Sequence, residues 1–229
     1  MSEWWTYRLT SFLLFSPRTY YRTIELYNLA IWPAQLAGMA IGVAIVVLLM
    51  TSIGQRGRII AALLAACWLW IAWSFHYQRY AQINWVAPWL AAAFVLQAVL
   101  LTVAGVLGGW LVLQPVGSRA FAIATSLVAI TVVGYPFLAP LTGRAWTTAE
   151  VFGIAPDPTA IATVAVLALV RGRIRWLLLV VPLLWCAATA LTLWAMKAPE
   201  AVVVVVATLF ASWSALRGSR NQIRATEAT

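Results

Sequence analysis

The residues best suited to chemistry lie around the single histidine of the chain, in the segment 75–85 (FHYQRYAQINW). If a helix continues through this segment, His76, Arg79 and Tyr80 fall on one face, because they are spaced at i, i+3 and i+4. A guanidinium can hold a carboxylate or phosphate, and the neighbouring ring groups can add hydrogen bonds. The pattern therefore predicts a site for a polar or anionic solute, with Asn84 as a further partner. An anchor that fixes the depth of a helix at a membrane surface is the alternative.

A second polar segment begins at Ser16, which has the residue type of an N-cap, and Pro17 suits the first helical position. We expect an interfacial helix here that continues into an apolar block, with a kink near Pro33. Glu25 is three residues after Arg22 and can form a surface ion pair with it. Alternatively, Glu25 faces Arg79 or His76 across the bundle and orients the site.

Composition narrows the class of protein. Of 229 residues, 64% are hydrophobic and 9% are charged, whereas soluble domains carry about 25% charged residues. This excludes a soluble globular enzyme, a disordered chain and a disulfide-rich module. The net charge of +9 is typical of loops that orient a membrane protein, so we expect no nucleic-acid partner. With one histidine and two isolated cysteines, no metal site, cofactor or catalytic residue is predicted.

Apolar blocks give the fold class: an all-α, polytopic transmembrane bundle. A span needs about 20 apolar residues. Seven blocks are candidates, and they cover approximately residues 29–53, 59–75, 85–113, 120–139, 159–170, 176–196 and 201–216.

The fifth block is short, although Asp157 suits an N-cap and Pro158 a first helical position. With seven spans, the basic residues divide nine to six, which places the N-terminus outside and the C-terminus in the cytoplasm. Without the fifth block the division is eleven to four, which favours six spans with both termini cytoplasmic. We expect seven, because an apolar helix behind an Asp-Pro start is hard to leave unburied.

The connection before this block contains a capping-box pattern at Thr147–Glu150. The pattern predicts a short helix to Ile154, followed by a break at residues 156–158. A short surface helix is the simpler interpretation. A broken helix that lines a cavity is the alternative, as in transporters.

Ionisable residues are absent from the seven blocks from Trp32 onward, which argues against a midplane proton carrier or voltage sensor. The deep polar candidates are Gln35 and Gln97, and Gln97 suits an interhelical hydrogen bond. Small-residue pairs such as Gly38 and Gly42 predict close helix packing within the chain, with dimerisation as the alternative.

Two strings carry a family resemblance: FHYQRYxxINW at 75–85 and PRTYYRxxELYNxxIWPAQ at 17–35. They resemble an uncharacterised bacterial family of multi-pass membrane proteins, which carries a domain-of-unknown-function label and is sometimes described as permease-like. The resemblance implies an inner-membrane location and no specific substrate.

Together these observations predict one integral membrane domain over residues 1–229, with an interfacial segment at 1–28, a bundle at 29–216 and a basic tail at 217–229. Its partners would be the lipid bilayer and a small polar or anionic solute, in a permease-like or channel-like protein. An accessory subunit that docks a second copy or another membrane protein is the alternative, and a membrane enzyme that uses His76 is a third. The solute site would consist of Glu25, His76, Arg79, Tyr80 and Asn84.

Overall fold

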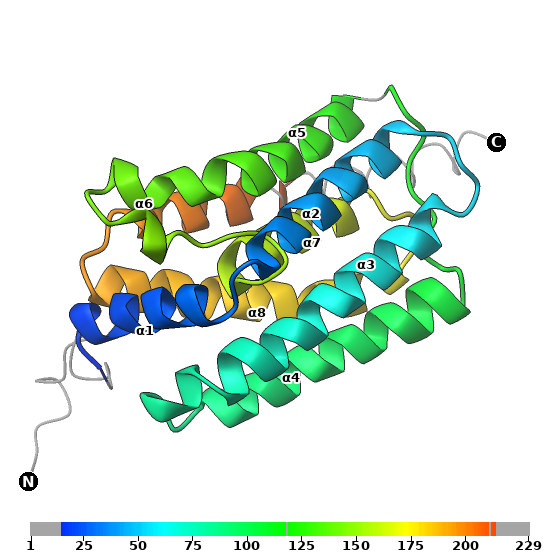
Figure 1. Cartoon of the computed structure of the whole chain (residues 1–229). Coiled ribbons are helices and arrows are strands. Elements are labelled where there is room, and N and C mark those ends of the chain that lie inside the picture. Colours follow the sequence, from blue (N-terminus) through cyan, green and yellow to red (C-terminus); the bar gives the residue numbers. More distant parts are fainter. Residues whose placement is uncertain (1–14, 118, 211, 214–229) are drawn as a thin grey trace, which may run out of the picture.

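The computed structural model describes residues 15–117, 119–210 and 212–213, and within these ranges it is a helical bundle without strands (Figure 1). The all-α prediction is confirmed. The main helices are α1 (Pro17–Ala30), α2 (Ala34–Met50), α3 (Arg56–Trp70), α4 (Ala87–Leu100), α5 (Arg119–Gly134), α6 (Leu138–Leu141), α7 (Pro156–Ala168) and α8 (Ile174–Ala195). Short π and 3₁₀ segments are η3 (Ile71–Tyr77), η4 (Tyr80–Gln82), η5 (Leu101–Leu107), η6 (Tyr135–Phe137) and η7 (Trp146–Thr148).

The predicted number of spans is wrong. Among the described residues, four helices are long and apolar enough to cross a membrane: Arg56–Gln82, Ala87–Leu107, Phe121–Leu141 and Ile174–Ala195. A fifth is gained if α1 and α2, which meet at a bend of 91°, count as one broken span. The fifth predicted block falls short, because its helix covers only Pro156–Ala168. The described part of the seventh block is a helix over Glu200–Phe210, and residues 211 and 214–216 of that block lie outside the described residues. The basic tail at 217–229 lies outside the described residues.

The short helix α7 occupies the centre of the bundle (Figure 1), and all 13 of its residues are buried. It packs mainly on α8 and α5. A hydrogen bond of 3.0 Å from Trp68 Nε1 to Thr163 Oγ1 joins it to α3. Ala155 is the N-cap and Pro156 the first helical residue, so the N-cap predicted at Asp157 is wrong by two positions.

A buried, non-helical stretch at residues 149–155 leads into α7. The predicted short surface helix is therefore wrong, because only the 3₁₀ turn η7 forms before Ala149 becomes extended. Irregular backbone inside an apolar bundle needs partners for its polar groups. Asn28 Nδ2 donates to the Ala149 carbonyl at 2.8 Å, and Tyr27 Oη donates to the Ile154 carbonyl at 2.9 Å.

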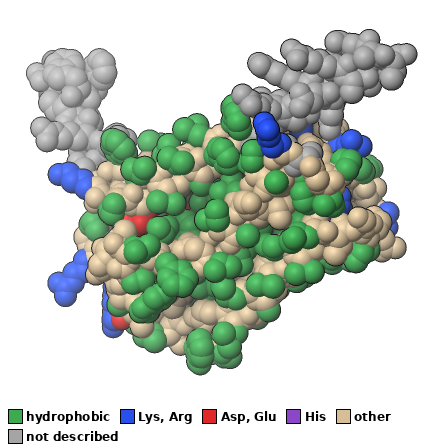
Figure 2. All heavy atoms as spheres, turned by 90° about the horizontal axis from the view of Figure 1, so that it is seen from above, with side chains coloured by type: hydrophobic (Ala, Val, Ile, Leu, Met, Phe, Trp, Pro, Cys, Tyr) green, Lys and Arg blue, Asp and Glu red, His purple; other side chains and the backbone are tan. Residues whose placement is uncertain are grey.

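The polar connections gather at two opposite ends of the bundle. At one end, called the Arg171 end, the Arg171 amide donates to the Val112 carbonyl at 2.8 Å and Arg56 donates to the Gln114 carbonyl at 2.8 Å. Hydrophobic side chains cover much of the visible face between the ends, and Lys and Arg cluster towards its margins (Figure 2). This distribution is typical of a membrane-embedded bundle.

At the other end, called the Arg144 end, Arg144 Nη2 lies 2.7 Å from Glu200 Oε1. Asn28 donates to the Thr147 carbonyl there at 2.8 Å. Ser16 caps α1 at this end as predicted, since its Oγ accepts from the Thr19 amide at 3.1 Å.

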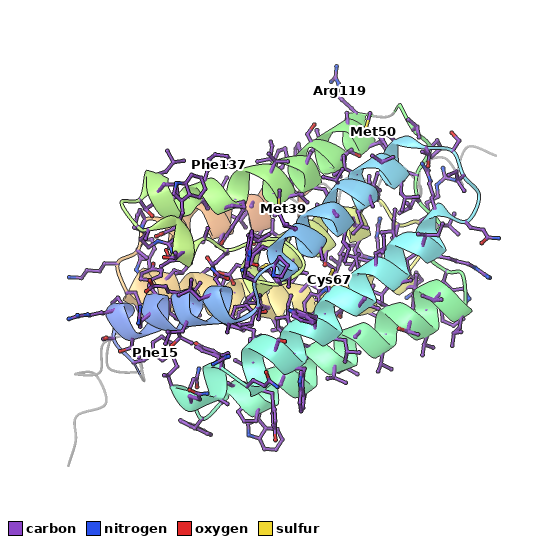
Figure 3. The ribbon with its side chains drawn as sticks, in the orientation of Figure 1. Phe15, Met39, Met50, Cys67, Arg119 and Phe137 are labelled. Carbon is purple, nitrogen blue, oxygen red and sulfur yellow. The ribbon has the colours of Figure 1, made fainter. Side chains whose placement is uncertain are left out.

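Small residues pack the chain against itself, as expected. A Cβ added at Gly38 would collide with the carbonyl oxygen of Phe152, and one at Gly42 would lie 2.6 Å from a methyl of Val132. Cys67 is a buried free thiol, whereas Arg119 extends away from the start of α5 (Figure 3).

Candidate functional site

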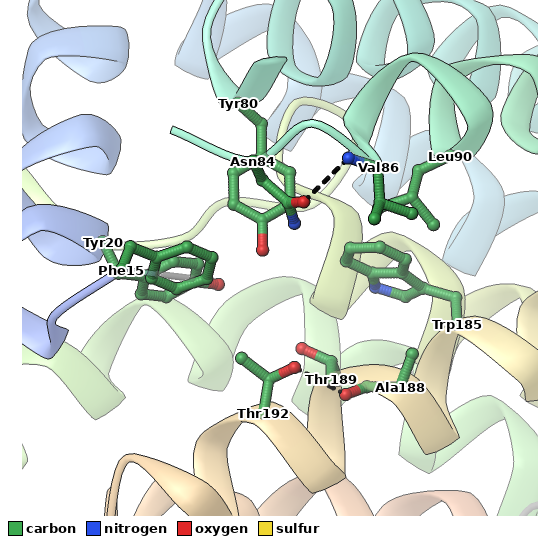
Figure 4. A pocket seen from close by; sticks show the side chains of 10 residues that line it. All are labelled: Phe15, Tyr20, Tyr80, Asn84, Val86, Leu90, Trp185, Ala188, Thr189 and Thr192. Atoms are coloured by element: carbon green, nitrogen blue, oxygen red, sulfur yellow. Dashed lines mark hydrogen bonds between the residues drawn. The ribbon is translucent and has the colours of Figure 1, made fainter. Parts of the chain in front are cut away.

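A pocket of about 240 Å³ lies between α1, η4 and α8 (Figure 4). We call it the α1–α8 pocket. It is lined by Phe15, Tyr20, Tyr80, Asn84, Val86, Leu90, Trp185, Ala188, Thr189 and Thr192. None of these side chains is basic or acidic, so the lining consists of aromatic rings, hydroxyls, one amide and aliphatic groups.

Aromatic rings form two walls of the α1–α8 pocket. On one side Phe15 stacks on Tyr20 with centroids 5.7 Å apart, and Tyr80 meets both rings edge-on. Trp185 stands on the other side, and the hydroxyls of Tyr20 and Tyr80 point into the space between (Figure 4). A pocket with few polar groups on apolar walls is typical of small-molecule sites.

Directly behind this lining lies Asp157, which is 1% exposed. Trp185 Nε1 donates to its Oδ1 at 2.8 Å, and Thr189 Oγ1 donates to its Oδ2 at 3.0 Å. Both donors line the pocket. A single layer of side chains therefore separates the carboxylate from the pocket.

The depth of Asp157 corrects an expectation from the sequence. Trp185 is near the middle of α8, a helix long enough to span a membrane. Asp157 is thus an ionisable group beside the midpoint of a candidate span, a position that usually marks a functional site. No lysine, arginine or histidine among the described residues forms an ion pair with it.

His76 is also deep rather than at the rim, with 0% exposure. Its ring lies 4.4 Å from Phe94, 4.9 Å from Trp185 and 5.9 Å from Tyr80, measured between centroids. Neither ring nitrogen has a hydrogen-bond partner within the described part of the chain. His76 therefore packs behind two pocket walls and does not line the pocket.

The predicted helical register around His76 is not formed. The α-helix ends at Trp70 and widens into the π-helix η3, and a 3₁₀ turn starts at Tyr80. A π-helix shifts the side chains that follow it, and such segments are frequent at functional sites. Tyr80 consequently faces the α1–α8 pocket, whereas Arg79 is not among the lining residues.

The other predicted site residues are divided between two places. Asn84 lines the α1–α8 pocket, and its Oδ1 accepts from the Val86 amide at 2.9 Å. Glu25 lies in a separate hollow of α1 with Arg22, to which it pairs at 2.7 Å as predicted. The structure therefore brings together Tyr80 and Asn84 but separates them from Glu25.

The two glutamines serve the packing of helices. Gln97 is fully buried and donates to the Leu178 carbonyl of α8 at 3.0 Å, which confirms the interhelical role. Gln35 is the second residue of α2, where it donates to the Asn28 carbonyl at 2.7 Å across the bend.

A buried ionic cluster at the Arg144 end adjoins the stretch that leads to Asp157. Arg144 pairs with Glu200 and lies 4.3 Å from the Tyr21 ring centre. Burial raises the pKa of the Glu150 carboxyl well above its usual range, and the charge of Asp157 raises it further, against the opposing effect of Arg144. Glu150 Oε1 has no hydrogen-bond partner among the described residues.

Sequence reasoning missed the central members of the site: Asp157, Trp185 and Thr189. Their signal was present, because Trp185 and Thr189 are spaced at i, i+4 on α8 and so face the same neighbour. Asp157 was recognised as a helix start, but the sequence placed it outside the apolar block that follows it.

Within the described part of the chain, the fold and site define an all-helical protein with four or five helices long and apolar enough to span a membrane, and with a polar pocket beside a buried carboxylate. Residues 18–226 match the family of unknown function DUF6064, and the chain belongs to that family. Comparison with curated proteins and with solved structures found no match in either set.

Proposed function

We propose that the protein is a permease-like membrane protein that binds a small polar solute in the α1–α8 pocket. One observation carries the proposal: a pocket with aromatic and hydroxyl lining reaches the middle of a candidate span, where a buried carboxylate accepts hydrogen bonds from two lining residues. A bundle that served only as a scaffold would have no need for a carboxylate at this depth, because burying it costs free energy.

Tyr80, Asn84 and Val86, which line the pocket, belong to the loop between two spans at the Arg144 end. On its inner side the pocket meets the buried residues around α7. A pocket that extends from a loop at one end to the middle of α8 suits a carrier that rearranges to release its solute better than an open channel. We place the protein in a bacterial inner membrane with the Arg171 end and the C-terminus in the cytoplasm, in line with the charge distribution and the family resemblance.

Neutral and polar solutes fit this pocket better than the anions first expected. Arg79 is not among the lining residues, whereas the carboxylate of Asp157 accepts hydrogen bonds from two of them. An anion in the pocket would be repelled by that carboxylate across a medium of low dielectric constant.

A binding experiment with a space-filling variant tests the proposal. The purified protein in detergent is heated with urea, glycerol, choline, betaine, acetate or phosphate, because a solute that binds the folded form raises the melting temperature. Ala188 lines the pocket, so Ala188→Phe fills it and is expected to abolish the stabilisation. Leu184 is 65% exposed on the same helix, and Leu184→Phe is the matched control that should retain it.

Flux of the stabilising solute into proteoliposomes then distinguishes a carrier from a docking subunit. We expect uptake with the wild type and with Leu184→Phe, and none with Ala188→Phe. If no solute of the panel stabilises or crosses, the permease hypothesis is wrong, and an accessory subunit becomes the better interpretation.

A further inference from the structure

We infer that the solute of the α1–α8 pocket is a small organic cation and that Asp157 is its counter-charge. This inference rests on the proposed function and specifies its substrate class. It depends on three features of the pocket: its aromatic walls, the absence of charged side chains among its described lining residues, and the hydrogen bonds of the carboxylate behind it.

The aromatic walls match the recognition of a cation without hydrogen-bond donors. Rings of Phe15, Tyr20 and Tyr80 contact one another on one side, and Trp185 faces them from the other (Figure 4). The face of an aromatic ring attracts a quaternary ammonium group, and several rings around one space form the cages that bind choline-like ligands. The pocket has a volume of about 240 Å³, and pockets for drug-sized ligands begin at about 300 Å³. The volume therefore suits a small ligand.

Asp157 is the charged group that two of the lining residues contact. Each of its oxygens accepts one hydrogen bond, from Trp185 Nε1 at 2.8 Å and from Thr189 Oγ1 at 3.0 Å. An ionised carboxylate is an acceptor at both oxygens, so this arrangement suits the charged form. It has no cationic partner among the described residues, and a buried charge without a partner is costly.

A cation in the α1–α8 pocket would provide that missing partner. Trp185 and Thr189 stand between Asp157 and the pocket, and each contacts the carboxylate through its polar atom while its other side lines the space. In a medium of low dielectric constant, the attraction between two charges extends over such a single layer of side chains. An uncharged ligand of the same shape would gain only the contact with the walls.

The experiment compares choline with its uncharged carbon isostere, 3,3-dimethylbutan-1-ol, by calorimetric titration of the full chain in detergent. We expect choline to bind at least about tenfold more tightly than the isostere, a difference of 1.4 kcal/mol. Asp157→Asn should remove most of this preference, while the isostere binds as in the wild type. The amide keeps the shape of the side chain, and unchanged binding of the isostere shows that the pocket is intact.

Glu25→Gln is the matched control, because it removes one negative charge from the other hollow of α1 and should leave both affinities unchanged. If Asp157→Asn binds choline as tightly as the wild type, Asp157 is not the counter-charge and the inference is wrong. If only neutral or anionic solutes of the wider panel bind, the cation class is wrong although the proposed function stands. If no solute binds, the proposed function itself fails.

Discussion

At the scale of single residues, two buried carboxyls near each other in the chain have different surroundings. Asp157 has a hydrogen-bond donor on each oxygen. Glu150 has a buried oxygen with no partner among the described residues, and burial raises its pKa. Hydrogen-bond donors favour the charged form of a carboxyl, whereas burial without such donors favours the protonated form.

This difference predicts a pH effect on stability that Glu150 controls. An acid whose pKa is raised in the folded state keeps a proton that the unfolded chain releases above about pH 4.3. The free energy of unfolding therefore falls as the pH rises from there towards the raised pKa. Glu150→Gln is neutral at every pH, so its melting temperature in detergent should exceed that of the wild type by an amount that grows from pH 5 to pH 8.

The size of this difference in melting temperature depends on how far the pKa of Glu150 is raised. Each unit of pKa is worth about 1.4 kcal/mol, and each kcal/mol moves the melting temperature by about 2–4 °C. Glu25→Gln serves as the control, because Glu25 is less buried and pairs with Arg22. An equal gain at pH 5 and pH 8 for Glu150→Gln would contradict a protonated Glu150.

Residue-scale prediction from the sequence succeeded where neighbours in the chain decide the outcome. Ser16 caps α1 and Arg22 pairs with Glu25 because the partners are three residues apart. Asp157 was misplaced because Pro156 and Pro158 both suit a first helical turn, and its partners are 28 and 32 residues away. Arg79 was misplaced because nothing in the residue types around Ile71–Tyr77 distinguishes a π-helix from an α-helix.

At the scale of elements, the non-helical stretch 149–155 decides where the site lies. It brings the start of α7 into the bundle and so sets the depth of Asp157. Its backbone depends on a few side chains of other elements. Tyr27 is the most informative, because its hydroxyl donates to the Ile154 carbonyl and accepts from Trp70 Nε1 at 3.1 Å.

Replacing Tyr27 by phenylalanine tests this dependence. The ring contact with Phe75 stays in place, but the buried carbonyl of Ile154 loses its donor, which costs about 1–3 kcal/mol. We expect a lower melting temperature and, if α7 shifts, weaker solute binding in the α1–α8 pocket. Tyr77→Phe is the matched control, since Tyr77 is 55% exposed. Equal stability of the two variants would show that the hydroxyl of Tyr27 does not hold the stretch.

At the scale of the whole molecule, hydrophobic blocks predicted the helical bundle and the approximate extent of most helices. They failed for the number of spans, because block length does not reveal whether an apolar helix faces lipid or other helices. All residues of α7 are buried, and this 13-residue helix rises only about 20 Å. The buried, non-helical stretch 149–155 precedes it, and no hydropathy pattern distinguishes such a stretch from a surface loop.

The arrangement of the two ends gives a final prediction about the path of the chain. The connections around Ser52 and Arg171 both lie at the Arg171 end, because they contact the same loop. The Arg171 amide donates to the Val112 carbonyl, and Arg56 donates to the Gln114 carbonyl. Gln82 and Ala145 belong to the Arg144 end, next to the hollow that contains Glu25.

Cysteine labelling tests this arrangement. In a background where Cys67 and Cys186 are alanine, single cysteines at these four positions are treated with a membrane-impermeant maleimide in intact cells and in inverted vesicles. We expect Ser52→Cys and Arg171→Cys to react in inverted vesicles only, and Gln82→Cys and Ala145→Cys to react in intact cells only, because the more basic side faces the cytoplasm. The decisive pair is Ala145 and Arg171, which flank the non-helical stretch and α7. If both react from the same side, this part of the chain does not cross the membrane, and Asp157 cannot be the counter-charge deep within a transmembrane pocket.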